Sequence, residues 1–212
     1  MIKKMHHKKI AQKAKTISQK PVKKDLIDKA DFEKIRKEMD FFEERREQII
    51  KTSREVIKLS KLIIYGIHKE DKDISSLVQK LKEKVDSLRT RGELQYSSFY
   101  KTAMQEYVEA VAMYEFLKNH KLPTQVELKV SAPDYLSGLC DLTGELMRKA
   151  NNFLIKGLQK EAILTKELVD LIYGEFLALD IRDNDLRKKA DQIKYNLRKL
   201  EDIALHIARR RR

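Results

Sequence analysis

Apolar residues along this chain recur mainly three and four positions apart, which is the spacing that places them on one face of an α-helix. β-branched and aromatic residues rarely alternate with a period of two, as they would in a half-buried strand. The prolines Pro21, Pro123 and Pro133 leave two long stretches with no proline to break a helix. The pattern therefore predicts an all-α fold.

The same periodicity, read with helix-capping residues, predicts six main helices and one short turn of helix. Thr124 followed by Glu127 is a capping box for the short turn, and Ser131, Pro133 and Asp183 mark helix starts. The acidic segment 70–73 after Gly66 is expected to end the first helix and cap the second. The main helices are expected at about 25–67, 73–90, 97–119, 133–157, 160–179 and 184–208.

A first helix of this length would extend about 60 Å at about 1.5 Å per residue. That is longer than a compact monomer of this size is wide. We therefore expect part of this helix to pack on another chain. The alternative is a kink near Ser53, although no proline or glycine lies there to cause one.

Charge is distributed unevenly between the ends and the body of the chain. Residues 1–24 hold nine lysines and no acid, and four arginines occupy 209–212. The remaining residues hold equal numbers of basic and acidic side chains, so the net charge of +13 lies in the two ends. We therefore divide the chain into a basic arm, 1–24, and a helical domain, 25–212. Such an arm is suited to nucleic-acid phosphates, and the alternative is a solvated tail with no partner.

Several classes of protein are excluded by the sequence. The single cysteine, Cys140, excludes a disulfide framework and a zinc site built from cysteines. Apolar stretches are too short to span a membrane, and no signal segment follows the basic start, so we expect a cytoplasmic protein without membrane contact. No phosphate-binding glycine loop or nucleophile elbow is present, and the histidines are scattered.

Two windows, 102–117 and 130–147, contain no lysine or arginine but keep their share of acids. Glu106 and Glu109 lie three positions apart on one predicted helix, and Asp141 and Glu145 lie four apart on another, so each pair shares a helix face. We expect these carboxylates to lack basic partners. The glycines at 138 and 144 lie inside the second of these helices, which suggests that a neighbouring backbone approaches closely.

Like-charged pairs of this kind need a counter-charge if they are buried together. A hard divalent cation such as Mg²⁺, with Mn²⁺ as an alternative, takes oxygen ligands and activates water against a phosphodiester. Four carboxylates from two helices would suit such a site, although a solvated helix face explains the same spacing. Arg148 and the pair Arg89 and Arg91 are candidates to hold an RNA backbone, while Arg148 can equally form an ion pair with Glu145.

These acids lie in two longer sequence words, QEYVEA at 105–110 and DYLSGLCDLTGELMR at 134–148. Both resemble the translin superfamily, and its translin-associated factor X branch more closely than translin itself. A looser match at 53–68 and the order of helices extend the resemblance over roughly 25–208. The basic arm is not covered.

The resemblance implies an all-α fold of about seven helices, assembled into a hollow octamer that encloses single-stranded RNA or DNA. It also implies the catalytic subunit type, an Mg²⁺-dependent endoribonuclease whose catalytic carboxylates fall on Glu106, Glu109, Asp141 and Glu145. The alternative is a non-catalytic shell that binds single-stranded RNA or DNA, as translin does. A helical scaffold that binds only protein would leave the acids unexplained.

Overall fold

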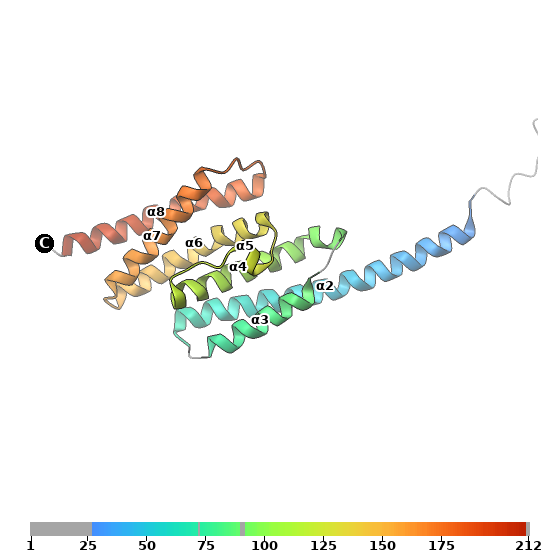
Figure 1. Cartoon of the computed structure of the whole chain (residues 1–212), viewed down its shortest axis with the longest axis horizontal. Helices are drawn as coiled ribbons and strands as arrows, with labels where there is room; N and C mark the ends of the chain where they lie inside the picture. The colour runs from blue at the N-terminus through green and yellow to red at the C-terminus, as the bar shows by residue number, and fades with distance from the viewer. Residues whose placement is uncertain (1–26, 72, 90–91, 211–212) are drawn as a thin grey trace, which may run out of the picture. The chain divides into compact units, whose positions relative to one another are not determined.

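The computed structural model describes residues 27–71, 73–89 and 92–210. Within these residues it contains seven α-helices, one short 3₁₀ helix and no strand, which confirms the all-α prediction (Figure 1). None of the described helices is long and apolar enough to cross a membrane. The elements are α2 (Lys29–Lys69), α3 (Ile74–Leu88), η1 (Glu93–Tyr96), α4 (Ser98–Asn119), α5 (Gln125–Leu128), α6 (Ala132–Ile155), α7 (Gln159–Leu177) and α8 (Asn184–Arg210).

The chain divides into two units, one up to Glu44 and one from Arg45 to Arg212. The predicted basic arm 1–24, Arg91 and the last two arginines lie outside the described residues. The division into an arm and a helical domain therefore stays a prediction.

Helix α2 has 41 residues and runs through Ser53 without a break, so the kink considered there is absent. Its buried apolar positions begin only at Ile49. Before that point, Phe32, Ile35 and Met39 are 45%, 41% and 51% exposed. The first turns of α2 thus carry an apolar row that the described residues of this chain do not bury.

The end of α2, at Lys69, lies two residues beyond the predicted end near 67. Gly66 is buried inside the helix, which continues to Lys69, and Glu70 then adopts a left-handed conformation with φ of 59°. The buried Lys149 side chain of α6 donates a hydrogen bond from Nζ to the carbonyl of Ile67 at 3.0 Å. This bond satisfies a carbonyl of the last turn and joins the end of α2 to α6.

Most of the predicted helix starts are confirmed by side-chain hydrogen bonds. Thr124 and Glu127 form the capping box of α5, and the Asp183 carboxylate accepts from the Leu186 amide at 2.8 Å. Ser131 accepts from the amide of the third residue after it at the start of α6. Asp73 was expected to cap α3, but its side chain makes no capping hydrogen bond.

Helix α6 lies at the centre of the second unit and packs against α4, α7 and α8 (Figure 1). The closest approach is at Gly138, where an added Cβ would lie 2.6 Å from Cβ of Val108 and 2.7 Å from the carbonyl oxygen of Gln105. The expectation of a close backbone is therefore confirmed at Gly138. It is wrong at Gly144, where the nearest atom would be Nδ2 of Asn196 at 3.7 Å, an ordinary contact.

Candidate acidic site and nucleic-acid groove

The four predicted site carboxylates come together where α4 packs on α6. Glu109 is buried, and its pKa is raised to about 8, first by burial and then by the charges of Asp141, Glu106 and Glu145. Burial and the nearby Asp141 also raise the pKa of Glu106, although Lys61 opposes this. The four acids thus lie within electrostatic reach of one another, as helix-face spacing and the tight contact at Gly138 require.

Three of these four carboxylates face a basic side chain that comes from a different helix. The expectation that they lack basic partners is therefore wrong, because it considered only neighbours in the sequence. Glu109 makes no ion pair or hydrogen bond through its carboxyl group with the described residues. The three pairs are Lys61 with Glu106 at 3.5 Å, His68 with Glu145 at 2.5 Å and Lys189 with Asp141 at 2.5 Å.

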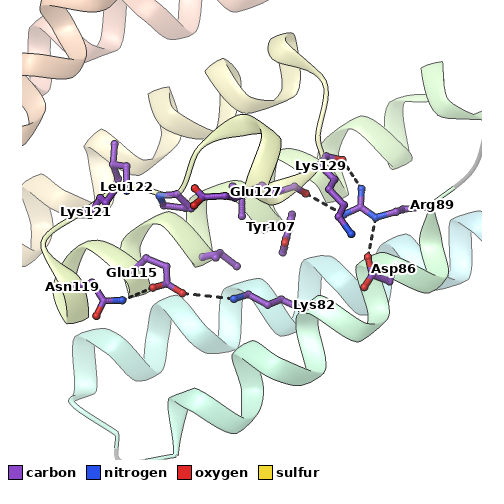
Figure 2. A pocket seen from close by; sticks show the side chains of 13 residues that line it. Lys82, Asp86, Arg89, Tyr107, Glu115, Asn119, Lys121, Leu122, Glu127 and Lys129 are labelled. Atoms are coloured by element: carbon purple, nitrogen blue, oxygen red, sulfur yellow. Dashed lines mark hydrogen bonds and ion pairs between the residues drawn. The ribbon is translucent and has the colours of Figure 1, made fainter.

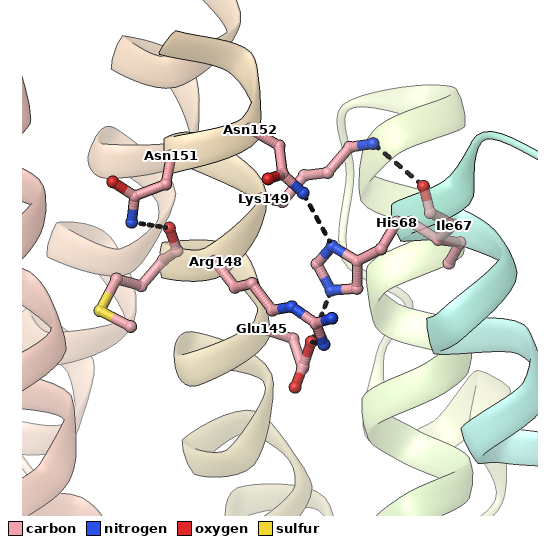
Figure 3. A network of polar contacts seen from close by, with 8 residues as sticks. Ile67, His68, Glu145, Arg148, Lys149, Asn151 and Asn152 are labelled. Carbon is pink, nitrogen blue, oxygen red and sulfur yellow. Dashed lines mark hydrogen bonds and ion pairs between the residues drawn. The ribbon is translucent and has the colours of Figure 1, made fainter. Parts of the chain in front are cut away.

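The His68 ring is almost completely buried between α2 and α6 (Figure 3). The amide nitrogen of Asn152 lies 3.4 Å from Nδ1, and Nε2 donates its hydrogen to the Glu145 carboxylate. Arg148 Nη1 lies 3.4 Å from the same carboxylate oxygen. The hydrogen bond from His68, followed by the charge of His68 and of Arg148, lowers the pKa of Glu145 although burial opposes this. Of the two roles left open for Arg148, the ion pair is formed.

A groove of about 1390 Å³ lies beside this site. Tyr96 and Tyr100 are among its lining residues, and so is Lys189, whose ammonium group contacts Asp141. Among the described residues that line it, six basic side chains outnumber three aspartates. The basic ones are Arg45, Arg89, Lys101, Lys129, Lys188 and Lys189. Positive charge combined with aromatic rings is the lining that a nucleic-acid strand requires.

Arg89 also lines a second, smaller cavity of about 430 Å³ (Figure 2). Its guanidinium donates to the carbonyls of Lys129 and Leu128, the latter at 3.0 Å, and to the carboxylate of Asp86 at 2.9 Å. Arg89 therefore joins the end of α3 to the end of α5 in this structure. Its contact with RNA stays a prediction.

The donor set of the acidic site is suited to a hard divalent cation, since all four groups are carboxylates. Within the described residues, however, no three histidine, cysteine, aspartate or glutamate side chains are already arranged as ligands of one ion. In this structure Lys61, His68 and Lys189 face three of these carboxylates instead. Neighbouring Cys140 is buried, and its pKa is raised to about 12, so its thiol stays protonated and does not serve as a nucleophile.

Sequence reasoning missed the basic partners of the site and the glutamine that holds one of them. Lys61 and His68 lie seven positions apart, so they share one face of α2. This spacing is a signal that the sequence could have given. Nothing in the lysine-rich sequence of α8 distinguishes Lys189 from its neighbours. Gln105 begins the word QEYVEA, but a glutamine there carried no chemical signal of its own.

The profile of the Translin family matches residues 44–211, which is most of the chain. The chain belongs to the translin family. Translin-associated protein X from Mus musculus is 25% identical over 217 aligned positions, which cover 81% of this chain and 75% of that protein. The homolog of that protein from Schizosaccharomyces pombe is 30% identical over 125 positions, covering 50% and 54% of the two chains.

A protein of Methanocaldococcus jannaschii, named uncharacterized protein MJ0175, is 36% identical over 111 positions. That match spans about half of each chain, 49% in both cases. Among solved structures, apo-NeC3PO superposes with a TM-score of 0.75 at 28% identity, covering 89% of this chain and 98% of that one. The complex of AfC3PO with duplex RNA gives 0.72 at 27% identity, covering 84% and 97%. The seven-helix arrangement is therefore the translin fold.

Proposed function

We propose that this translin-family protein is a divalent-metal-dependent endoribonuclease of the translin-associated factor X type. The observation that carries the proposal is the group of four carboxylates on α4 and α6, where burial and then the charges of the other three acids raise the pKa of Glu109 to about 8. A fold gains no stability from such a group by itself, because like charges at short range repel. Acids with perturbed pKa values beside a charged groove are typical of a functional site.

In this proposal Glu106, Glu109, Asp141 and Glu145 hold Mg²⁺ or Mn²⁺. The bound cation would supply an activated water and neutralise charge that develops on the phosphate. Glu109 holds a proton at neutral pH in the metal-free protein and gives it up when its carboxylate becomes a ligand. His68 and Arg148 contact the same oxygen of Glu145, so they would hold the orientation of this carboxylate.

The groove would carry the RNA strand to these acids. Its basic side chains would contact phosphates, and Tyr96, which is 68% exposed, offers a ring on which a base can stack. AfC3PO, a structural relative, is described in complex with duplex RNA, which supports RNA as the ligand class. The resemblance favours a single strand as the substrate, with single-stranded DNA as a further ligand, so both strand states belong in the assay.

We also propose that the protein is a homo-oligomer, most simply the octamer that the family resemblance implies. The exposed Phe32, Ile35 and Met39 of α2 support this, because an apolar row of this kind is stabilised by burial against another surface. A hollow assembly would place the groove and the acids of each subunit on an enclosed wall.

The test is cleavage of labelled RNA, single-stranded and duplex, in the presence of Mg²⁺, Mn²⁺ or EDTA. Glu109→Gln and Asp141→Asn each remove one proposed metal ligand from the site and are expected to abolish cleavage while the protein stays folded. Glu201→Gln, on the exposed surface of α8, removes a carboxylate elsewhere and should leave the rate unchanged. Cleavage at the parental rate by both site variants would disprove the proposal.

The second candidate function is a non-catalytic shell that binds single-stranded nucleic acid. The pairing of Lys61, His68 and Lys189 with three of the acids favours it, because these groups neutralise the carboxylates without a metal. RNA binding with no cleavage under any divalent cation would support this candidate. A protein that binds no RNA at all would instead be a helical scaffold.

A further inference from the structure

The ammonium group of Lys189 lies where the groove meets the acidic site. Its Nζ is 2.5 Å from Asp141 Oδ2 and 3.1 Å from Gln105 Oε1. The Gln105 amide donates to Asp134 Oδ1 at 3.4 Å, and Asp134 is held by the Ser131 hydroxyl at 2.6 Å. A continuous set of hydrogen bonds from the start of α6 therefore fixes the position of Lys189 against Asp141.

Lys189 differs from the other two basic partners of the site. The Lys61 side chain is 66% exposed, and its Nζ is 3.5 Å from Glu106, so water screens most of that interaction. His68 is buried and contacts Glu145 through a hydrogen bond from Nε2 of its ring, and not through an ammonium group. Lys189 brings a full positive charge into direct contact with a site carboxylate, and this charge also opposes the rise in the pKa of Glu109.

We propose that the Lys189 ammonium is the internal counter-cation of the acidic site, and that it must leave Asp141 before a divalent cation binds there. The inference rests on the proposed metal site. The displaced ammonium stays hydrated, because the Lys189 side chain is 35% exposed and lines the open groove. There it faces the path proposed for RNA phosphates.

This arrangement makes Lys189 a competitor of the metal ion. At the dielectric constant of water, an ammonium about 6 Å from a divalent cation weakens its binding about tenfold through repulsion, and more in a partly buried site. Lys189→Met removes the charge but keeps the length of the side chain. It is therefore expected to raise the affinity for Mn²⁺ about tenfold or more.

The experiment measures Mn²⁺ affinity by electron paramagnetic resonance of the free ion, on full-length protein freed of metal and without RNA. Lys188→Met is the matched control, because Lys188 lines the same groove but lies 3.7 Å from Asp185 and does not contact Asp141. It should change the affinity less than threefold. Lys189→Arg retains the charge and should bind Mn²⁺ much as the parental protein does.

Equal affinities for Lys189→Met and Lys188→Met, with clear Mn²⁺ binding by the parental protein, would overturn this inference and leave the proposed function standing. If neither the parental protein nor Lys189→Met binds Mn²⁺, the proposed metal site is overturned and this inference with it. Circular dichroism of each variant checks that the helices remain. Should Lys189→Met fail to fold, Lys189→Gln provides the same removal of charge with a polar side chain.

Discussion

Replacement of Glu109 by glutamine should stabilise the metal-free protein, and the gain should grow with pH. Glu109 has a pKa of about 8 in the folded protein, against a value of 4.5 for an unperturbed glutamate. Between these two values the folded protein keeps a proton that the unfolded chain releases. Raising the pH through this window therefore favours unfolding, and the contribution of Glu109 to stability falls by about 1.4 kcal/mol per pH unit. Glutamine does not titrate, so the free energy of unfolding of the variant does not fall with pH through this group.

The magnitude follows from the two pKa values. The free energy of unfolding of Glu109→Gln should exceed that of the parental protein by about 1 kcal/mol at pH 5 and about 3 kcal/mol at pH 7. For a protein of this size each kcal/mol corresponds to about 2–4 °C in Tm. The difference in Tm should therefore widen from a few degrees at pH 5 to about 6–12 °C at pH 7.

The assay is thermal unfolding followed by circular dichroism at matched protein concentration, in EDTA, from pH 5 to pH 8. Glu201→Gln on exposed α8 should run parallel to the parental protein at every pH. Glu145→Gln should shift the opposite way and lower Tm at pH 7, because His68 lowers the pKa of Glu145 and this carboxylate stabilises the fold in its charged form. A constant difference in Tm between Glu109→Gln and the parental protein across this range would refute the reasoning.

Three further predictions concern packing, assembly and the arm. Gly138→Ala should lower the free energy of unfolding by about 1–3 kcal/mol, because its methyl group would lie 2.6 Å from Val108 Cβ and 2.7 Å from a backbone oxygen. Gly144→Ala should raise the free energy of unfolding by about 1 kcal/mol, because alanine favours a helix and has room there. Urea titration measures both variants, and equal effects would show that the close approach at Gly138 is unimportant. Multi-angle light scattering should give a mass near eight times the subunit mass of 25.0 kDa, and a mass of one subunit at micromolar concentration would exclude the shell. Deletion of residues 1–24 should reduce the slope of log affinity for RNA against log salt concentration by about 0.7 for each phosphate that the arm neutralises. Cleavage at saturating RNA should be retained. An unchanged slope would show that the arm does not bind RNA.

The fold was largely predictable because its signals are local. Apolar spacing, two proline-free stretches and the caps at Thr124, Ser131 and Asp183 placed the helix boundaries within a few residues. The hydrogen bond from Lys149 to a carbonyl in the last turn of α2 could not be predicted, because the two residues are far apart in the sequence.

The acids of the site were predictable, but their partners were not. Helix spacing pairs Glu106 with Glu109 and Asp141 with Glu145, and the absence of lysine and arginine nearby in the sequence drew attention to them. His68 and Glu145, in contrast, are 77 positions apart, and Lys189 is 48 positions from Asp141. Only the tertiary packing of α2 and α8 on α6 brings these pairs together.

The tight approach of α4 and α6 at Gly138 has a consequence for how this fold can change its chemistry. The contact at Gly138 is made by backbone and apolar atoms of Gln105 and Val108, and not by the site acids. Exchange of those acids would therefore alter what the surface does without separating the two helices. The same packed helix pair can therefore carry different side chains, and different chemistry, at positions 106, 109, 141 and 145.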